Sequence, residues 1–324
     1  MVFSKIIATG SYLPDNIVTN DDMAKIVETS DEWISTRTGI KERRFAREGE
    51  LTSDLAFNAA TKALKKANIT ANDLDMIIVA TTTADNTFPS TAAKLHAMLQ
   101  IKSPIATFDI QAVCSGFVYG LSVADSMIKN HMAQKVLLIG AETMSRILDF
   151  NDRSTCVLFG DGAGAVILEA TENNPKEKNH SGILSTHLHS SGQYYDILKT
   201  QGGPSLGHGG KIYMDGPEVY KVAVNALSNV VKEALESNGL DKSDIDWLVP
   251  HQANKRIIMS MARKLNLSED NVIITIDKHA NTSAASIPIA LDYAIESGKI
   301  KQGQMILMEA AGGGMTWGAA LLRL

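Results

Sequence analysis

The residues best suited to chemistry lie in the segment 109–117, which contains Cys114. An apolar run precedes this cysteine and apolar residues recur at helical spacing behind Gly116, which predicts that Cys114 lies where a strand ends and a helix begins. The free N–H groups and dipole of a helix start favour a thiolate and can lower a cysteine pKa to about 3.5–7.5. Cys114 is therefore a candidate nucleophile. The alternative is a small buried apolar side chain, which is the usual role of a free cysteine and the one expected for Cys156.

Composition limits the classes of protein to consider. The chain has 324 residues, of which 44% are hydrophobic, enough for one large globular domain or two of ordinary size. Its two cysteines and the lack of a charged, then apolar leader after Met1 favour the cytoplasm. No apolar run reaches the roughly 20 residues of a membrane span, and a net charge of -5 with interspersed signs shows no nucleic-acid footprint.

The elements that must position Cys114 occur twice along the chain. Asp73 and Asp75 return 171 positions later as Asp244 and Asp246. The strand pattern of the first half that precedes Ala141 likewise returns 170 positions later. A nearly constant offset across several elements in the same order predicts two copies of one helix-strand unit.

Two duplicated halves are therefore expected, over residues 1–170 and 171–324. Their apolar strands, separated by helical stretches, predict mostly parallel sheets covered by helices, and hence two α/β halves packed face to face. The counterpart of the cysteine segment is 279–286, for which we expect another strand followed by a polar helix start.

Three side chains are predicted to converge between the halves. Asn281 lies in the counterpart of the Cys114 segment, and His251 follows a strand at the carboxyl end, where α/β sites gather. A thiolate beside an imidazole and an amide can form a thioester and then polarise a second carbonyl. Taken singly, His251 could instead be a capping residue and Asn281 a helix N-cap.

Two glycine runs bear on function: one excludes a class of fold, and the other is a candidate part of the active site. The run 160–164 resembles part of a dinucleotide fingerprint, but an apolar strand follows where that motif needs a helix, which excludes a nucleotide-binding fold of that kind. The run 312–314 lies between two strands, where a backbone N–H could form half of an oxyanion hole with the N–H of Cys114. A tight turn is the alternative for 312–314.

The chain resembles the bacterial β-ketoacyl-[acyl carrier protein] synthase III family from end to end. That family has a thiolase-like fold, in which two duplicated α/β halves form a five-layered αβαβα arrangement, in agreement with the repeat. The motifs that carry the resemblance are TSDEW at 29–33 with RTGI at 37–40, AVCSGF at 112–117, FGDGA at 159–163, HQAN at 251–254, NTSAAS at 281–286 and GGGMTWG at 312–318.

The resemblance implies a decarboxylative Claisen condensation that starts fatty acid synthesis. Cys114 would take an acyl group, typically acetyl, from acyl-CoA, and malonyl-acyl carrier protein would follow. His251 and Asn281 would bind the malonyl thioester carbonyl, and the N–H groups of Cys114 and Gly313 would form the oxyanion hole. The products would be 3-oxoacyl-acyl carrier protein, CoA and CO2. No metal or redox cofactor is implied, since the CoA thioester is a substrate.

The resemblance also assigns binding residues. Trp33 and Arg153 resemble the pair that encloses the CoA adenine, and Phe88 a residue that crosses a homodimer interface to the partner's acyl pocket. Thr29 and Arg37 would lie near the nucleotide end of CoA, and Gly216 and Asn254 along the pantetheine channel. The basic patch for the acidic carrier protein would comprise Lys221, Arg256, Arg263 and Lys264. Departures from the family pattern, which put the starter chain in doubt, are Ala311, Met315, Asp215 and Pro217.

Two other classes are weighed against a condensing enzyme. The order Cys114, His251, Asn281 overlaps that of papain-like hydrolases, but the flanks of Cys114 lack their signature and the duplicated halves do not suit their fold. A non-catalytic module that binds carrier protein would not require all three residues. Within the superfamily, related enzymes condense other starters, while thiolases use a second cysteine and elongating synthases a second histidine.

Overall fold

In the computed structural model, which describes residues 2–177 and 180–324, the buried strands of the first half form one five-stranded sheet. Its order is β1-β7-β6-β4-β5, and β4 is parallel to both of its neighbours. The β6–β7 and β1–β7 pairs are antiparallel. The strands are β1 (Phe3–Tyr12), β4 (Met76–Ala80), β5 (Ala106–Ile110), β6 (Lys135–Thr143) and β7 (Asp161–Thr171).

The second half forms a four-stranded sheet of order β11-β12-β13-β8. Only its β11–β12 pair is parallel. The prediction of mostly parallel sheets was therefore wrong, because an apolar run indicates burial on both faces and does not set strand direction. The strands are β8 (Gly182–Ser190), β11 (Trp247–Pro250), β12 (Met305–Gly312) and β13 (Thr316–Arg323).

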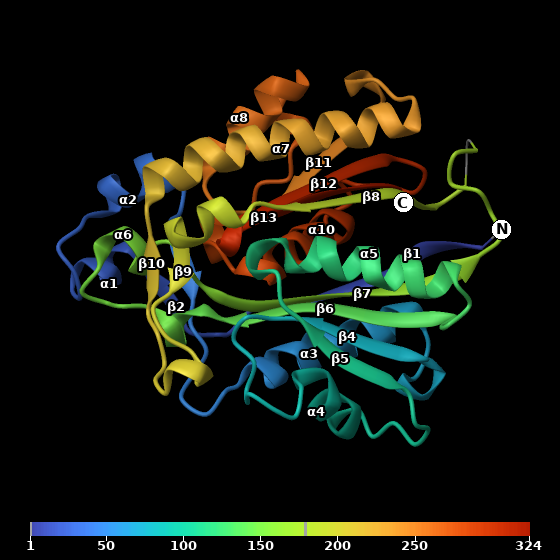
Figure 1. The fold of residues 1–324 in the computed structure, drawn as a ribbon, viewed down its shortest axis with the longest axis horizontal. Helices are drawn as coiled ribbons and strands as arrows, with labels where there is room; N and C mark the ends of the chain where they lie inside the picture. Colours follow the sequence, from blue (N-terminus) through green and yellow to red (C-terminus); the bar gives the residue numbers. More distant parts are fainter. Residues whose placement is uncertain (1, 178–179) are drawn as a thin grey trace.

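Helices complete a five-layered arrangement, as predicted (Figure 1). Two helices, α5 (Gly116–Lys129) and α10 (Ser286–Glu296), lie between the sheets. Both are apolar around most of their circumference, which suits a helix with a sheet on each side. The outer face of the first sheet is covered by α3 (Thr52–Ala67) and α4 (Thr91–Met98), and that of the second by α7 (Gly216–Asn238) and α8 (Lys255–Leu265).

Shorter elements lie at the end of the molecule that holds α2 in Figure 1. They are β2 (Ile17–Thr19), α1 (Asn20–Ala24), α2 (Asp31–Thr38), β3 (Glu42–Arg44), α6 (Arg153–Cys156), β9 (Leu198–Thr200), β10 (Ile212–Met214) and α9 (Ile276–His279). Across the residues that the structure describes, we find no helix with the length and apolar character of a membrane span.

The second half lacks one predicted strand. The stretch ahead of Asn281 forms the helical turn α9, and the counterpart of β5 is a single parallel bridge between Leu248 and Val272. Three residues separate Val272 from α9, too few to extend the pairing. The predicted boundary between the halves, at residue 170, falls beside the end of β7 at Thr171.

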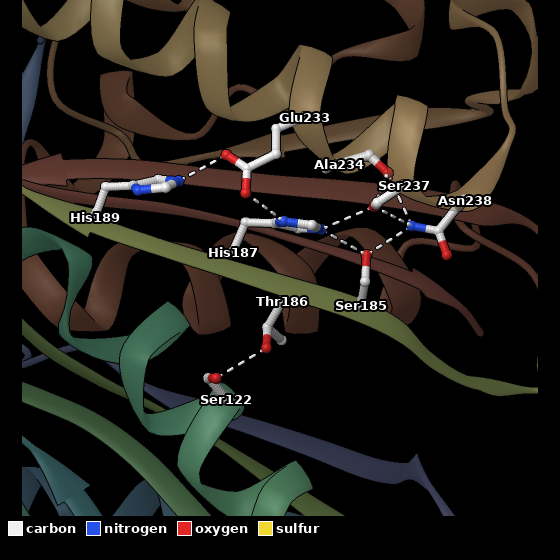
Figure 2. Close-up of polar contacts among 9 residues, drawn as sticks. All are labelled: Ser122, Ser185, Thr186, His187, His189, Glu233, Ala234, Ser237 and Asn238. Carbon is white, nitrogen blue, oxygen red and sulfur yellow. Dashed lines mark hydrogen bonds and ion pairs between the residues drawn. The ribbon is translucent and has the colours of Figure 1, made fainter.

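Helix α7 is tied to β8 by polar side chains (Figure 2). Glu233 of α7 accepts hydrogen bonds from His187 (3.0 Å) and His189 (2.6 Å) of β8. Asn238, at the end of α7, donates to Ser185 (2.7 Å). Thr186, which points to the other face of the sheet, donates to Ser122 of α5. Because successive side chains of β8 point to opposite faces of the sheet, β8 is hydrogen-bonded to helices on both sides.

The two halves approach most closely where α10 begins. A Cβ at Gly116 would lie 3.3 Å from the Ala284 Cβ, and a Cβ at Gly140 would lie 2.7 Å from the Ala284 carbonyl carbon. Backbone from the second half thus fills the space that a side chain on β6 would occupy. The start of α5, which follows Cys114, and the residues that follow Asn281 meet at this contact.

Replacing Gly140 with alanine should lower the free energy of unfolding by about 1–3 kcal/mol, because overpacking at a backbone contact forces the halves apart. Gly192→Ala is the matched control, since a Cβ there meets no atom within 4 Å, and it should change stability by less than about 0.5 kcal/mol. Urea denaturation of both variants measures the difference. Equal stabilities would contradict the close contact.

Candidate active site

Cys114 occupies the junction that the sequence predicts. Strand β5 ends at Ile110, a 3-10 turn spans Val113–Ser115, and α5 begins at Gly116. Val113 has a left-handed backbone (φ 48°), and the same conformation recurs at Ser283 (φ 50°), 170 positions later. The duplicated turn presents Cys114 to the space between the halves.

Burial opposes the thiolate that a helix start favours at Cys114. The thiol is only 4% exposed, and burial raises its pKa to about 12, with the buried Glu142 adding to the increase and Asn281 opposing it. Glu142 accepts hydrogen bonds from the backbone N–H groups of Thr82 and Thr83. Cys114 lies in the turn directly before α5, and the dipole at the start of that helix favours the thiolate. Desolvation of the charged form has the larger effect. Burial therefore favours the protonated form of Cys114.

Asn281 is held by both halves of the molecule. Its backbone N–H donates to Leu158 (2.9 Å), and its carbonyl accepts from Gly160 (3.0 Å). Its side-chain Oδ1 accepts from the Ser283 N–H (2.8 Å). That bond orients the amide, so that Nδ2 is the atom left to donate to a ligand.

His251 follows the carboxyl end of β11, as predicted, and its ring is oriented by Ser286. The Ser286 hydroxyl oxygen accepts from the Gln252 N–H (3.2 Å) and lies 2.6 Å from His251 Nδ1. We assign the hydroxyl hydrogen to the bond with Nδ1, which places the ring proton on Nε2. Among the described residues Nε2 has no hydrogen-bond partner. Burial, with a smaller effect of His279, lowers the pKa of His251 to about 3, so the ring is neutral.

One cavity of about 990 Å³ contains the three predicted side chains Cys114, His251 and Asn281. Its wall also includes Trp33, Arg37, Gly216, Asn254 and Arg256, which were predicted to bind CoA or carrier protein. The lining is mainly apolar, with few polar groups, as in small-molecule sites. The cavity therefore unites a nucleophile with two neutral hydrogen-bond donors.

The predicted adenine site is closed in this structure. The guanidinium of Arg153 lies 4.6 Å from the centre of the Trp33 ring, and that of Arg37 lies 4.7 Å from it. Arg153 also donates to the Glu28 carbonyl (2.9 Å). A purine ring between Trp33 and Arg153 would need Arg153 to move away from the indole, because the two are in direct contact.

Cationic side chains surround a second depression beside the cavity. It has a volume of about 330 Å³, and Arg37, Lys255, Arg256 and Arg263 line it. It shares Arg37 and Arg256 with the larger cavity, so positive charge collects where the two adjoin.

The other predicted residues lie outside the cavity wall. Gly313 is buried and begins the 3-10 turn that follows β12, and its neighbour Gly312 lies so close to the Cys114 turn that a Cβ would stand 2.7 Å from the Cys114 nitrogen. The Thr29 hydroxyl is buried. Phe88 is 83% exposed. The two remaining lysines of the basic patch, Lys221 and Lys264, lie on α7 and α8.

Two residues of this region were not predicted. Ser286 belongs to a motif that we noted, but only the structure shows its bond to His251. Glu309 lies in an apolar strand pattern, is 1% exposed and lines the cavity. A carboxyl group within an otherwise apolar run was the available signal for Glu309.

Comparisons with known proteins agree on one family. The family model described as 3-oxoacyl-[acyl-carrier-protein (ACP)] synthase III matches residues 108–192, and the model of its C-terminal part matches 235–324. The β-ketoacyl-[acyl-carrier-protein] synthases III of Paramagnetospirillum magneticum and Thiobacillus denitrificans are 56% and 54% identical, and the alignments cover 100% of each chain. The crystal structure of the Aquifex aeolicus 3-oxoacyl-[acyl-carrier-protein] synthase III has a TM-score of 0.93 at 50% identity and covers 99% of this chain and 100% of its own.

Alkylation of Cys114 by iodoacetamide should accelerate about tenfold per pH unit between pH 6 and pH 9, because the thiolate fraction grows in that proportion well below a pKa. Mass spectrometry of peptides measures the rate. Cys156 is an internal control, since it is fully buried and burial raises its pKa to about 11. A rate that levels off below pH 8 would show a preformed thiolate instead.

Proposed function

The chain belongs to the 3-oxoacyl-[acyl-carrier-protein] synthase III family, and we propose that Cys114, His251 and Asn281 carry out its reaction. An enzyme of this family is an acyltransferase that condenses an acyl-CoA with malonyl-acyl carrier protein and so starts fatty acid synthesis. The observation that carries the proposal is that a buried thiol and two neutral side chains able to donate hydrogen bonds, His251 and Asn281, line one cavity.

In the first half-reaction, the Cys114 sulfur attacks the carbonyl carbon of acyl-CoA. Because burial raises the thiol pKa to about 12, its proton leaves as the new carbon–sulfur bond forms and passes to the departing CoA sulfur. Acyl-Cys114 and free CoA thiol result, with atoms and charge in balance. The backbone N–H groups of Cys114 and Gly313 are proposed to hold the developing oxyanion.

In the second half-reaction, malonyl-acyl carrier protein replaces CoA. Its thioester carbonyl accepts hydrogen bonds from His251 Nε2 and Asn281 Nδ2, which stabilise the enolate formed as CO2 leaves. The enolate carbon attacks the acyl-Cys114 carbonyl, the Cys114 sulfur departs, and one proton from solvent restores the thiol. The malonyl carboxylate supplies the electron pair for the new carbon–carbon bond, so we propose that no metal or redox cofactor takes part.

The residues at the outer end of the cavity support binding of CoA. We propose that CoA lies along the cavity, with its pantetheine arm past Gly216 and Asn254 and its nucleotide near Thr29, Trp33 and Arg37. Arg153 would close over the adenine from the other side. An aromatic face beside guanidinium groups suits a purine and a phosphate.

The basic patch supports docking of the acidic carrier protein. Lys221 on α7 is well exposed, and Arg256 and Arg263 of α8 both line the cationic depression. Lys264, the fourth predicted member, bonds to Ser228 of α7 (2.6 Å) and so also holds the two helices together. A local positive field can steer an acidic partner although the chain is acidic as a whole.

We also propose acetyl-CoA as the starter, a homodimer and a cytoplasmic location. An 83% exposed phenylalanine at position 88 is costly in water, which supports its burial against a second copy of the chain. Ala311, on the cavity wall, leaves more room than the phenylalanine found there in many relatives, so a panel of starters should include longer and branched acyl groups.

The three catalytic variants should separate the two half-reactions. Cys114→Ala should gain no acyl mass from acetyl-CoA, whereas His251→Ala and Asn281→Ala should become acylated but form product at least about 100-fold more slowly, as expected for loss of an oxyanion donor. Intact-protein mass spectrometry after each substrate is added measures both steps. Equal loss of acylation in all three variants would contradict this division, and acyl loss by hydrolysis alone would favour a cysteine hydrolase.

Reversing a charge in the basic patch should weaken carrier-protein binding. We expect Lys221→Glu to raise the KM for malonyl-acyl carrier protein about fivefold without changing acylation by acetyl-CoA, because only the protein substrate spans the patch. Lys232→Glu on the same helix is the matched control, as Lys232 is equally exposed and lies outside the patch. Similar KM values for the two variants would argue against docking on α7.

A further inference from the structure

Glu309 is a buried acid that the mechanism above does not use. It lies on β12, an inner strand of the second sheet, where Met305 and Leu307 alternate with it and contact the core beneath α7 and α8. Its side chain is 1% exposed, and no described residue donates a hydrogen bond to Oε2. Buried polar atoms are rarely left without a partner, so this oxygen indicates a ligand or water in the cavity.

The position of Glu309 relative to His251 is fixed by the backbone. The His251 N–H donates to the Glu309 carbonyl oxygen (2.8 Å), and both side chains line the same cavity as Cys114. Glu309 and the three side chains proposed to act on the substrate thus line one continuous cavity.

The surroundings of Glu309 keep its carboxyl group neutral. The wall contributed by α7 and α8 next to it is apolar, and its partners on β11 and β13 are Pro250 and Ala319. Burial raises the pKa of Glu309 to about 8, and the charge of Lys264 on α8 opposes this increase only in part. The apolar wall residues are Ala223, Leu227 and Ile258. Near pH 7 Glu309 is thus a hydrogen-bond donor.

The malonyl group needs such a donor. Its carboxylate enters a cavity whose cationic wall residues, Arg37 and Arg256, adjoin the outer basic depression. His251 and Asn281 are occupied by the thioester carbonyl. A neutral acid can bind a carboxylate through a short O–H···O⁻ hydrogen bond, whereas an ionised one would repel it.

We propose that the carboxyl group of Glu309 binds the malonyl carboxylate by donating a hydrogen bond to it, and so orients the carbon–carbon bond that breaks. This inference rests on the proposed function. Glu309 keeps its proton throughout: the bonding electron pair passes to the enolate, and CO2 leaves as a neutral molecule that no longer holds the hydrogen bond.

The test is the pH dependence of kcat/KM for malonyl-acyl carrier protein. In the wild type it should fall about fivefold between pH 8 and pH 9, as Glu309 ionises and its donor is lost. Glu309→Gln, which donates at every pH, should stay within about threefold of wild type at pH 7 and show no such fall. Glu233→Gln is the matched control and should keep the wild-type fall, because Glu233 bonds to His187 and His189 outside the cavity (Figure 2).

Comparing the wild type with Glu309→Gln also distinguishes Glu309 from the other titratable groups near the site. His251 and Cys114 have pKa values of about 3 and 12, so neither titrates in this range. Glu142, whose pKa burial raises to about 7, is present in all variants. A fall that persists unchanged in Glu309→Gln, or a flat wild-type profile, would overturn the inference.

A second measurement needs no variant. Malonyl-CoA and its carboxamide analogue should both compete with acetyl-CoA for Cys114 of the wild type, and only malonyl-CoA should lose affinity between pH 7 and pH 9. Parallel behaviour of the two would overturn the inference. Absence of any 3-oxoacyl product from the wild type would instead contradict the proposed function, and the two failures are therefore distinguishable.

Discussion

The candidate site depends on the close contact of the two halves around Ala284. Glycine at 116 and 140 lets the backbone at the start of α10 approach α5 and β6 without an intervening side chain. This contact sets the distance between the duplicated turns, which carry Cys114 on one side and Asn281 on the other. Neither half contains a complete site, so the chemistry depends on the interface and not on either sheet alone.

Desolvation governs the charges inside that interface. Burial raises the pKa of Cys114 and Glu309 and lowers that of His251, which leaves a thiol, an acid and an imidazole that are all neutral near pH 7. Positive charge is confined to the outer rim, at residues such as Arg37 and Arg256. A negatively charged substrate group is therefore attracted at the rim but meets only neutral donors within. Such an environment favours loss of charge from a carboxylate.

Much of this arrangement could be predicted from the sequence, because the repeat preserved both the order and the spacing of its elements. The offset of about 170 residues predicted two α/β halves packed face to face and placed Cys114 near Asn281, while the five layers followed from the family resemblance. The offset did not predict that β7 and β13 run antiparallel to both of their neighbours, since an apolar run indicates burial and not strand direction. The local pattern predicted a helix start at Cys114 but not the desolvation imposed by residues far away in the chain, which opposes a thiolate. The bond from Ser286 to His251 was hidden for the same reason: it joins side chains 35 positions apart.

The shape of the cavity has a consequence for the order of events. Cys114 shares one elongated space with Trp33, Gly216 and Asn254, so the pantetheine arms of CoA and of the carrier protein would occupy the same passage. The first product must then depart before the second substrate arrives. Under the proposed mechanism the enzyme would alternate between a free and an acylated form. Its steady-state kinetics should then follow a double-displacement pattern, in which each carrier competes for the form meant for the other. The ratio of the two carriers in the cell, and not only their amounts, would then set the rate at which new chains begin.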